Sequence, residues 1–217
     1  MFVFLLQIQR FFVIKQYKIY YSYIMVKNVF IFRHGQTDKN LAGLWQGYSI
    51  DVPLNKTGLE QAEQLAEKVK TLNLDKLFSS PLIRARQTAQ KISEANGNMP
   101  VTVYNDLHEA DFGVAEGQTF AKIQETFGEL ATNYLNPDLT NWDNHFPKGE
   151  SKHEVFDRVY ACLNRIVNEN EGKNLGIVCH AGVMNALECG LSLKGLTLEN
   201  CAVWHLKYDT DTMKFYQ

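Results

Sequence analysis

Two histidines occupy matching positions in the 217-residue sequence, each at the end of a short apolar run and each with a glycine close behind. His34 comes just after residues 29–32, and His180 comes directly after residues 174–179. In open α/β sheets, ligands bind outside the carboxyl ends of the strands. One such histidine could simply end its strand, but two with the same placement indicate a functional site.

Two arginines are suited to act with these histidines. Arg33 directly precedes His34, and Arg84 falls in the first turns of a predicted helix. A guanidinium group offers a fixed fork of donors that matches phosphate or carboxylate, so this set favours an anionic substrate. Helical periodicity alone does not choose Arg84 over Arg86. We expect ordinary surface ion pairs for Arg86, Arg158 and Arg165.

The remaining histidines and the cysteines do not form a metal-binding pattern. No two histidines are three or four residues apart on a predicted helix, and the four cysteines contain no C-x-x-C pair. The spacing of these residues therefore does not favour a metal site. Unpaired thiols packed as small apolar groups fit a reducing, cytoplasmic compartment. The histidines expected in loops or at the surface are His108, His145, His153 and His205.

The elements that must position these residues alternate along the chain. Short apolar or β-branched runs predict strands at residues 29–32, 75–79, 101–104, 174–179 and 202–208. Helical spacing of apolar residues predicts helices at 57–71, 81–92, 119–128, 152–166 and 181–190. This alternation predicts a three-layer α/β/α fold with a mostly parallel central sheet and helices on both faces.

Three helix starts carry local signals. Thr57 with Glu60 and Ser151 with Glu154 each form a capping-box pattern, and Ser80 before Pro81 fits an N-cap followed by proline. Residues 105–150 are long for a connection, which indicates a functional loop or lid.

Five blocks of the sequence, in this order and at this spacing, resemble the histidine phosphatase superfamily, the phosphoglycerate-mutase-like proteins. The resemblance extends from about residue 25 to residue 208, and it implies the phosphoglycerate-mutase-like fold. The blocks are RHGQTDKN at 33–40, SSPLIRARQTA at 79–89, LHEADFGVAEG at 107–117, GES at 149–151 and VCHAGV at 178–183.

The resemblance implies a covalent mechanism, and we predict no metal and no other cofactor. His34 would be the nucleophile that accepts the phosphoryl group, which requires a neutral imidazole with one nitrogen held by a neighbour. Arg33, Arg84 and His180 would surround the phosphoryl oxygens, since phosphoryl transfer depends mainly on positioning and charge stabilisation. Glu109 would act as general acid and base, and partial desolvation should raise its pKa toward neutrality.

Other residues receive supporting assignments from the same resemblance. Glu150 is interpreted as structural, and Asp111 and Glu116 as solvated loop carboxylates rather than rivals of Glu109. Trp45 and Trp142 are packing residues that could also line the leaving-group pocket. The predicted substrate-binding residues are Asn40, Gln46, Gly47 and Ala181.

The blocks that identify the site do not distinguish a phosphatase from a mutase, so the reaction class is judged from other features. Mutases in this family carry a longer lid and an added C-terminal tail that exclude water, and they tend to have Arg where Ala110 follows Glu109. We therefore favour a phosphomonoesterase acting on a small phosphorylated metabolite. The alternatives are a cofactor-dependent phosphoglycerate mutase and, less favoured, an inactive binding protein. The leaving group cannot be deduced from the sequence.

Composition limits the remaining possibilities. The sequence is 45% apolar and 21% charged with a net charge of −2 and no basic block, which argues against nucleic-acid and membrane partners. Residues 1–24 contain no Asp, Glu, Gly or Pro, and we interpret them as an N-terminal extension that comes from a mis-assigned start and is not part of the core. Residues 25–217 are then one histidine phosphatase domain. A homodimer is possible if the strand at 202–208 is an exposed edge.

Overall fold

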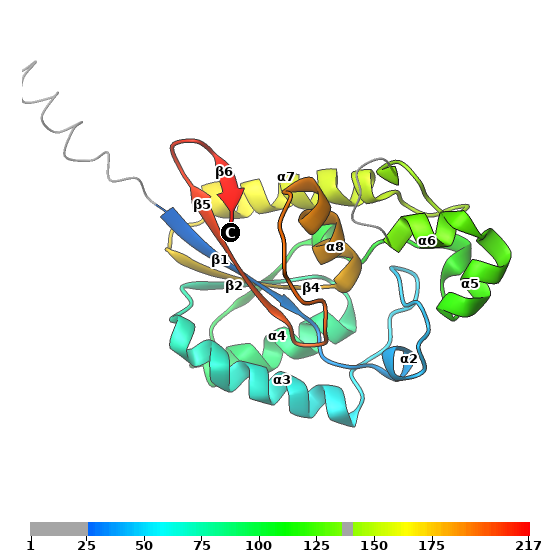
Figure 1. The fold of residues 1–217 in the computed structure, drawn as a ribbon. Coiled ribbons are helices and arrows are strands. Elements are labelled where there is room, and N and C mark those ends of the chain that lie inside the picture. The colour runs from blue at the N-terminus through cyan, green and yellow to red at the C-terminus, as the bar shows by residue number, and fades with distance from the viewer. Residues whose placement is uncertain (1–25, 136–140) are drawn as a thin grey trace, which may run out of the picture.

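A six-stranded sheet runs through the computed structural model, which describes residues 26–135 and 141–217 (Figure 1). The strand order is β3-β2-β4-β1-β5-β6. The first four strands in that order are parallel, whereas β5 runs antiparallel to β1 and β6 antiparallel to β5. The strands are β1 (Val26–Arg33), β2 (Lys76–Ser79), β3 (Val101–Val103), β4 (Asn174–Cys179), β5 (Val203–Asp209) and β6 (Lys214–Tyr216).

Helices cover both faces of this sheet, so the predicted three-layer fold is confirmed (Figure 1). Along β1, Phe30 and Phe32 pack with helices α3 (Lys56–Val69) and α4 (Ile83–Ala95), while Val29 and Ile31 belong to the larger core on the other side. Helices α7 (Lys152–Glu169) and α8 (Ala181–Gly190) cover that second face. Successive residues of a strand point to opposite faces, which explains why a strand buried on both sides reads as a continuous apolar run.

The predicted helix starts are right in one case and wrong in two. Ser151 and Glu154 form the capping box of α7 as predicted. The cap of α3 is Asn55 rather than Thr57: its side chain accepts a hydrogen bond from the amide of Gly58. Helix α4 begins after Leu82 rather than at Pro81, and its N-cap has no side-chain hydrogen bond.

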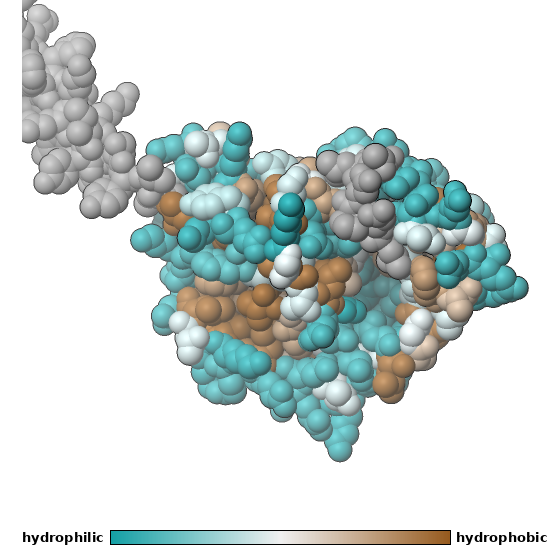
Figure 2. All heavy atoms as spheres, viewed as in Figure 1, coloured by the Kyte–Doolittle hydropathy of each residue, from teal (hydrophilic) through white to brown (hydrophobic). Residues whose placement is uncertain are grey.

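The long connection between β3 and α7 forms a lobe beside the sheet. It contains the predicted helix α5 (Phe120–Phe127) and an unforeseen helix α6 (Glu129–Leu135), with short 3-10 turns at η2 (Asn105–Leu107) and η3 (Gly113–Ala115). A further 3-10 turn, η1 (Lys70–Leu72), ends α3, and a short helix α2 (Asp38–Leu41) follows β1. In the space-filling view the surface is hollowed between the body of the sheet and this lobe (Figure 2).

The strand predicted as the last one is followed by one more short strand. Beyond β5 the chain turns at Asp209, whose side chain accepts the amides of Asp211 and Thr212, and returns as β6. β6 pairs only with residues 207–209, so residues 203–206 have a strand partner on one side, β1, and none on the other among the described residues. The expectation of an edge therefore holds for the first part of β5 and not for its end. A three-residue strand is too short to show an apolar period, so β6 left no signal in the sequence.

The prediction for residues 1–24 lies outside the described part of the chain. Among the described residues, none of the helices is both long enough and apolar enough to cross a membrane.

Candidate active site

The two strand-end histidines meet at the carboxyl edge of the sheet. β1 and β4 are parallel neighbours in a register that pairs Arg33 with Cys179, so His34 and His180 each follow directly after the paired residues. Their ring centroids are 5.1 Å apart. The convergence predicted from the sequence is therefore present in the fold.

His34 is held in the state that a nucleophile requires. The ring is 2% exposed, and its Nδ1 lies 2.7 Å from the carbonyl oxygen of Gly35, to which it can only donate. That contact leaves Nε2 with its lone pair. Burial holds the pKa of His34 well below its usual value, and the charges of Arg33 and Arg84 lower it further. The imidazole is thus neutral around pH 7.

Three buried nitrogens around His34 have no partner within residues 26–135 and 141–217. They are Nε of Arg33, Nε of Arg84 and Nδ1 of His180. Leaving a buried donor unsatisfied costs about 1–3 kcal/mol, and more for a charged group. Such a cluster is explained if a bound anion accepts from these groups.

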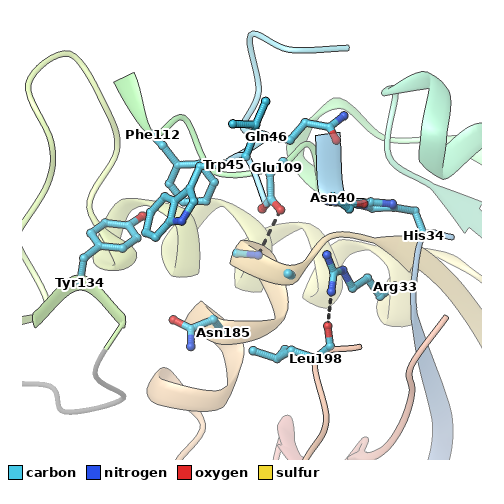
Figure 3. Close-up of a pocket in the computed structure, with 13 residues that line it drawn as sticks. Arg33, His34, Asn40, Trp45, Gln46, Glu109, Phe112, Tyr134, Asn185 and Leu198 are labelled. Carbon is cyan, nitrogen blue, oxygen red and sulfur yellow. Dashed lines mark hydrogen bonds between the residues drawn. The ribbon is translucent and has the colours of Figure 1, made fainter. Parts of the chain in front are cut away.

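Both arginines are fixed by contacts with backbone carbonyls. Arg84 is fully buried and donates from Nη1 to Ile50 at 2.9 Å and from Nη2 to Gly47 at 3.2 Å, while Arg33 donates from Nη1 to Leu198 (Figure 3). Arg86, which the helical periodicity could not separate from Arg84, is exposed. The geometry therefore places Arg84 in the site.

Ser80 sets the hydrogen on His180, a contact that the sequence analysis did not foresee. Its hydroxyl oxygen lies 2.6 Å from Nε2 of His180 and accepts the amide of Leu82 at 3.3 Å. The Ser80 hydroxyl proton has no acceptor other than Nε2 among the described residues, and a hydroxyl that donates to Nε2 leaves the imidazole hydrogen on Nδ1. Burial, followed by nearby Arg84, holds the pKa of His180 well below its usual value. His180 therefore presents a neutral N–H donor.

The Glu109 carboxyl group is fixed by three backbone amides. It accepts from Ala110 at 2.8 Å, from Gly182 at 3.1 Å and from Val183 at 3.2 Å, the last two in the first turn of α8 (Figure 3). The side chain is 4% exposed. Burial raises the pKa of Glu109, and this effect outweighs Arg84 and the amide donors, which lower it. A carboxyl group in this environment can carry a proton at higher pH than a solvated one.

Arg158 supports Glu109 from behind rather than forming the surface ion pair expected for it. It donates to the carbonyl oxygens of Asp106 at 2.8 Å, His108 at 3.0 Å and Glu109 at 3.2 Å. It also pairs with Glu150 at 2.8 Å. These partners lie about fifty residues before Arg158 in the chain, apart from Glu150, so sequence spacing gave no sign of the network.

Asn40 is oriented by an asparagine that the sequence analysis missed. The Oδ1 atom of Asn40 accepts from the amide of Thr37 at 3.2 Å and from Nδ2 of Asn200 at 3.3 Å. Nδ2 of Asn200 also donates to the carbonyl of His34 at 3.1 Å. With its oxygen engaged in this way, Asn40 presents its NH₂ group to a ligand.

A cavity of about 240 Å³ opens in front of these groups. Asn40, Gln46 and Ala181 line it, together with Arg33, His34 and Glu109. Gly47 does not: its carbonyl binds Arg84, and a Cβ there would lie 2.0 Å from the Glu116 carboxylate. Arg84 and His180 are fully buried and are not among the residues that line the cavity.

The other candidates take supporting places. Glu150 accepts the amide of Asp111 at 2.9 Å, in line with the structural role expected for it. Glu116 is not free in solvent: it accepts the amides of Ser49 at 3.1 Å and Phe112 at 3.2 Å. Trp45 lines the cavity, whereas Trp142 packs on Phe156 and His153. No group of three His, Cys, Asp or Glu side chains in the described ranges is arranged to hold a metal ion.

The chain has relatives among known proteins. Residues 29–216 match the family model of the histidine phosphatase superfamily, branch 1. A putative phosphoserine phosphatase 2 of Hydrogenobacter thermophilus is 33% identical, over 85% of this chain and 86% of that protein. A probable phosphoglycerate mutase GpmB of Citrobacter koseri is 32% identical, over 83% and 84% respectively.

A solved structure agrees with these relatives. The mycobacterial glucosyl-3-phosphoglycerate phosphatase superposes with a TM-score of 0.75 at 26% identity, over 87% of this chain and 95% of that one. The family model, the relatives named as phosphatases and the phosphatase fold agree with one another. This protein belongs to branch 1 of the histidine phosphatase superfamily and is a phosphoric monoester hydrolase.

Proposed function

We propose that this protein is a metal-independent phosphomonoesterase that hydrolyses a small phosphorylated metabolite through a phosphohistidine on His34. The observation that carries the proposal is the cluster of unpartnered buried donors on Arg33, Arg84 and His180, which surrounds a neutral His34. Two guanidinium groups and an N–H donor supply the charge stabilisation that a transferring phosphoryl group needs. A cytoplasmic location belongs to the same proposal, and the four free cysteines support it.

In the first step, Nε2 of His34 attacks phosphorus. The N–P bond forms as the ester P–O bond breaks, and the leaving oxygen takes the proton of the Glu109 carboxyl group. The raised pKa of Glu109 supports this role, because it keeps the acid protonated at higher pH.

In the second step, water replaces the alcohol. The Glu109 carboxylate takes a proton from the water as its oxygen bonds to phosphorus, and the N–P electron pair returns to Nε2 of His34. Inorganic phosphate is released, and Glu109 is protonated again for the next cycle. The amides of Gly182 and Val183 keep the carboxylate at the same place in both steps.

A phosphoglycerate mutase is the second candidate, because one relative of comparable identity carries that name. A mutase would transfer the phosphoryl group back to a hydroxyl of a phosphoglycerate before water arrives. Against it stands the residue after Glu109, which is the buried apolar Ala110 rather than a cation for a substrate carboxylate.

The test is product analysis by phosphorus NMR with the full-length protein in excess EDTA. Two reactions run in parallel, one with phenyl phosphate and one with 3-phosphoglycerate plus 2,3-bisphosphoglycerate, each repeated with His34→Ala. The proposal expects inorganic phosphate that depends on His34 and is unaffected by EDTA. Conversion to 2-phosphoglycerate with little free phosphate would identify a mutase, and phosphate release by His34→Ala would overturn the assigned nucleophile.

A further inference from the structure

The cavity has two chemically different ends. One end holds His34, Arg33 and Glu109, and the other is formed by side chains without charge (Figure 3). In the close-up, three aromatic rings gather on the side away from His34. The uncharged end is lined by Trp45, Phe112, Tyr134 and Asn185.

The aromatic rings form a fixed wall. The centroid of Trp45 lies 4.9 Å from that of Phe112 and 6.0 Å from that of Tyr134, and Phe112 and Tyr134 are 5.8 Å apart. The fully buried Phe146 packs edge-to-face against Trp45, with ring centroids 5.7 Å apart. Aromatic contacts of this geometry favour a flat, apolar partner, because ring faces and edges add to the area buried.

Positive charge is confined to the phosphate end. Among the described residues that line the cavity, Arg33 carries the only permanent positive charge, and it lies beside His34. Lys152 is 3% exposed, with Nζ 5.7 Å from the centre of the Tyr134 ring, and it is not part of the lining. Arg158 is engaged with Glu150 and backbone carbonyls.

A carboxylate on the leaving group would therefore meet no cation among the described residues that line this end. Burying an ionised carboxylate is costly unless a charge or several hydrogen bonds match it. The Glu109 carboxyl group adds repulsion whenever it is ionised. The Asn185 amide, on the inner side of α8, supplies a neutral hydrogen-bonding group in the same wall.

We propose that the leaving group is an uncharged alcohol with a flat apolar face, an aryl or similarly shaped ring that packs against Trp45 and Tyr134 and bonds to Asn185. This proposal deepens the proposed function and rests on it. It separates this chain from phosphatases named for phosphoserine or a phosphoglycerate, since both of those substrates carry a carboxylate.

The test compares phenyl phosphate with 4-carboxyphenyl phosphate, which differ by one carboxylate at the far end of the ring. The proposal expects kcat/KM to be at least about tenfold higher for phenyl phosphate, the ratio for one unfavourable contact of about 1.4 kcal/mol. Phosphoserine and 3-phosphoglycerate should be poorer substrates still. Every reaction is repeated with His34→Ala to measure background.

A pair of variants on α8 tests whether the missing positive charge causes the preference for phenyl phosphate. Asn185→Lys places a cation in the apolar end and should reduce or reverse the preference for phenyl phosphate. Glu188→Gln adds the same unit of charge to α8 outside the cavity lining and should leave the ratio unchanged. If both variants change the ratio of kcat/KM values equally, the net charge of the protein alone sets the substrate preference, and the proposal is overturned.

The failures can be told apart. If all substrates are hydrolysed only with His34 present but 4-carboxyphenyl phosphate is equal or better, the specificity proposal is wrong and the proposed function stands. If no substrate gives phosphate that depends on His34, the proposed function and the specificity proposal are both wrong.

Discussion

Gly182 is the position where the smallest possible change should disable the general acid. A Cβ on this residue would lie 2.5 Å from Oε1 of Glu109, whereas ordinary contacts begin at 3.4 Å. In Gly182→Ala the carboxyl group must therefore withdraw by about 0.9 Å. The hydrogen bonds from the amides of Gly182 and Val183, now 3.1 and 3.2 Å, would be lost.

The expected loss is large and selective. General acid catalysis contributes about 10²–10⁴-fold, and a misplacement of about 1 Å costs about 100-fold. We expect kcat/KM for an alkyl phosphate to fall about 100-fold, which is about 2.7 kcal/mol in activation free energy. For 4-nitrophenyl phosphate, whose leaving group departs without a proton, the loss should stay below about fivefold. Alanine favours the helix over glycine by up to about 1 kcal/mol, so the fold should persist.

The assay measures both substrates by steady-state and stopped-flow kinetics, because kcat/KM reports phosphorylation alone. A burst of nitrophenolate is expected in Gly182→Ala, since water activation by the displaced Glu109 becomes slow. Gly190→Ala is the matched control: on the same helix its Cβ would meet the Phe156 ring at 2.2 Å, so it should lower Tm without selectivity between substrates. Equal losses for both substrates in Gly182→Ala would refute the role given to Glu109.

Three further predictions concern groups around the site. Asn200→Ala removes the donor that orients Asn40, so kcat/KM should fall about tenfold and the KI of orthovanadate should rise by a similar factor. An unchanged KI would mean that Asn200 has only a structural role. Arg158→Met removes the ion pair of Glu150 and the donor to three backbone carbonyls, and urea denaturation should show that the free energy of unfolding falls by about 2–3 kcal/mol. A loss below about 0.5 kcal/mol would contradict a stabilising role for this network. Below about pH 6.5, His34 and His180 bind protons in the unfolded chain but stay neutral in the folded protein, where burial lowers their pKa. The free energy of unfolding should therefore fall as the pH falls, by up to about 1.4 kcal/mol per pH unit for each histidine. His180→Asn should reduce this slope, and an identical slope would count against a neutral His180.

The parts of the site that lie on regular elements could be predicted from the sequence. His34 and His180 follow apolar runs, and the parallel sheet brings the ends of such runs to one edge. The capping box of Ser151 and Glu154 was equally predictable, because both of its hydrogen bonds are local. Local chemistry and sheet rules were sufficient in these cases.

Contacts between distant segments decided the features that the sequence did not predict. Asn55 caps α3 instead of Thr57 because its amide nitrogens also bond to Gln36, in the loop that follows His34. The Ser80 hydroxyl contacts His180, a hundred residues away, as well as the amide of Leu82 next to it in the chain. These contacts form only in the folded protein, and a single sequence does not show which distant residues will meet.

The most direct test of the mechanism is to trap the intermediate. Glu109→Gln should still be phosphorylated by 4-nitrophenyl phosphate but should hydrolyse the phosphoenzyme slowly, because the base that activates water is gone. Intact-protein and peptide mass spectrometry after a neutral quench should find one acid-labile phosphoryl group on His34, absent in His34→Ala. A phosphoryl group on another residue, or none despite turnover, would contradict the mechanism.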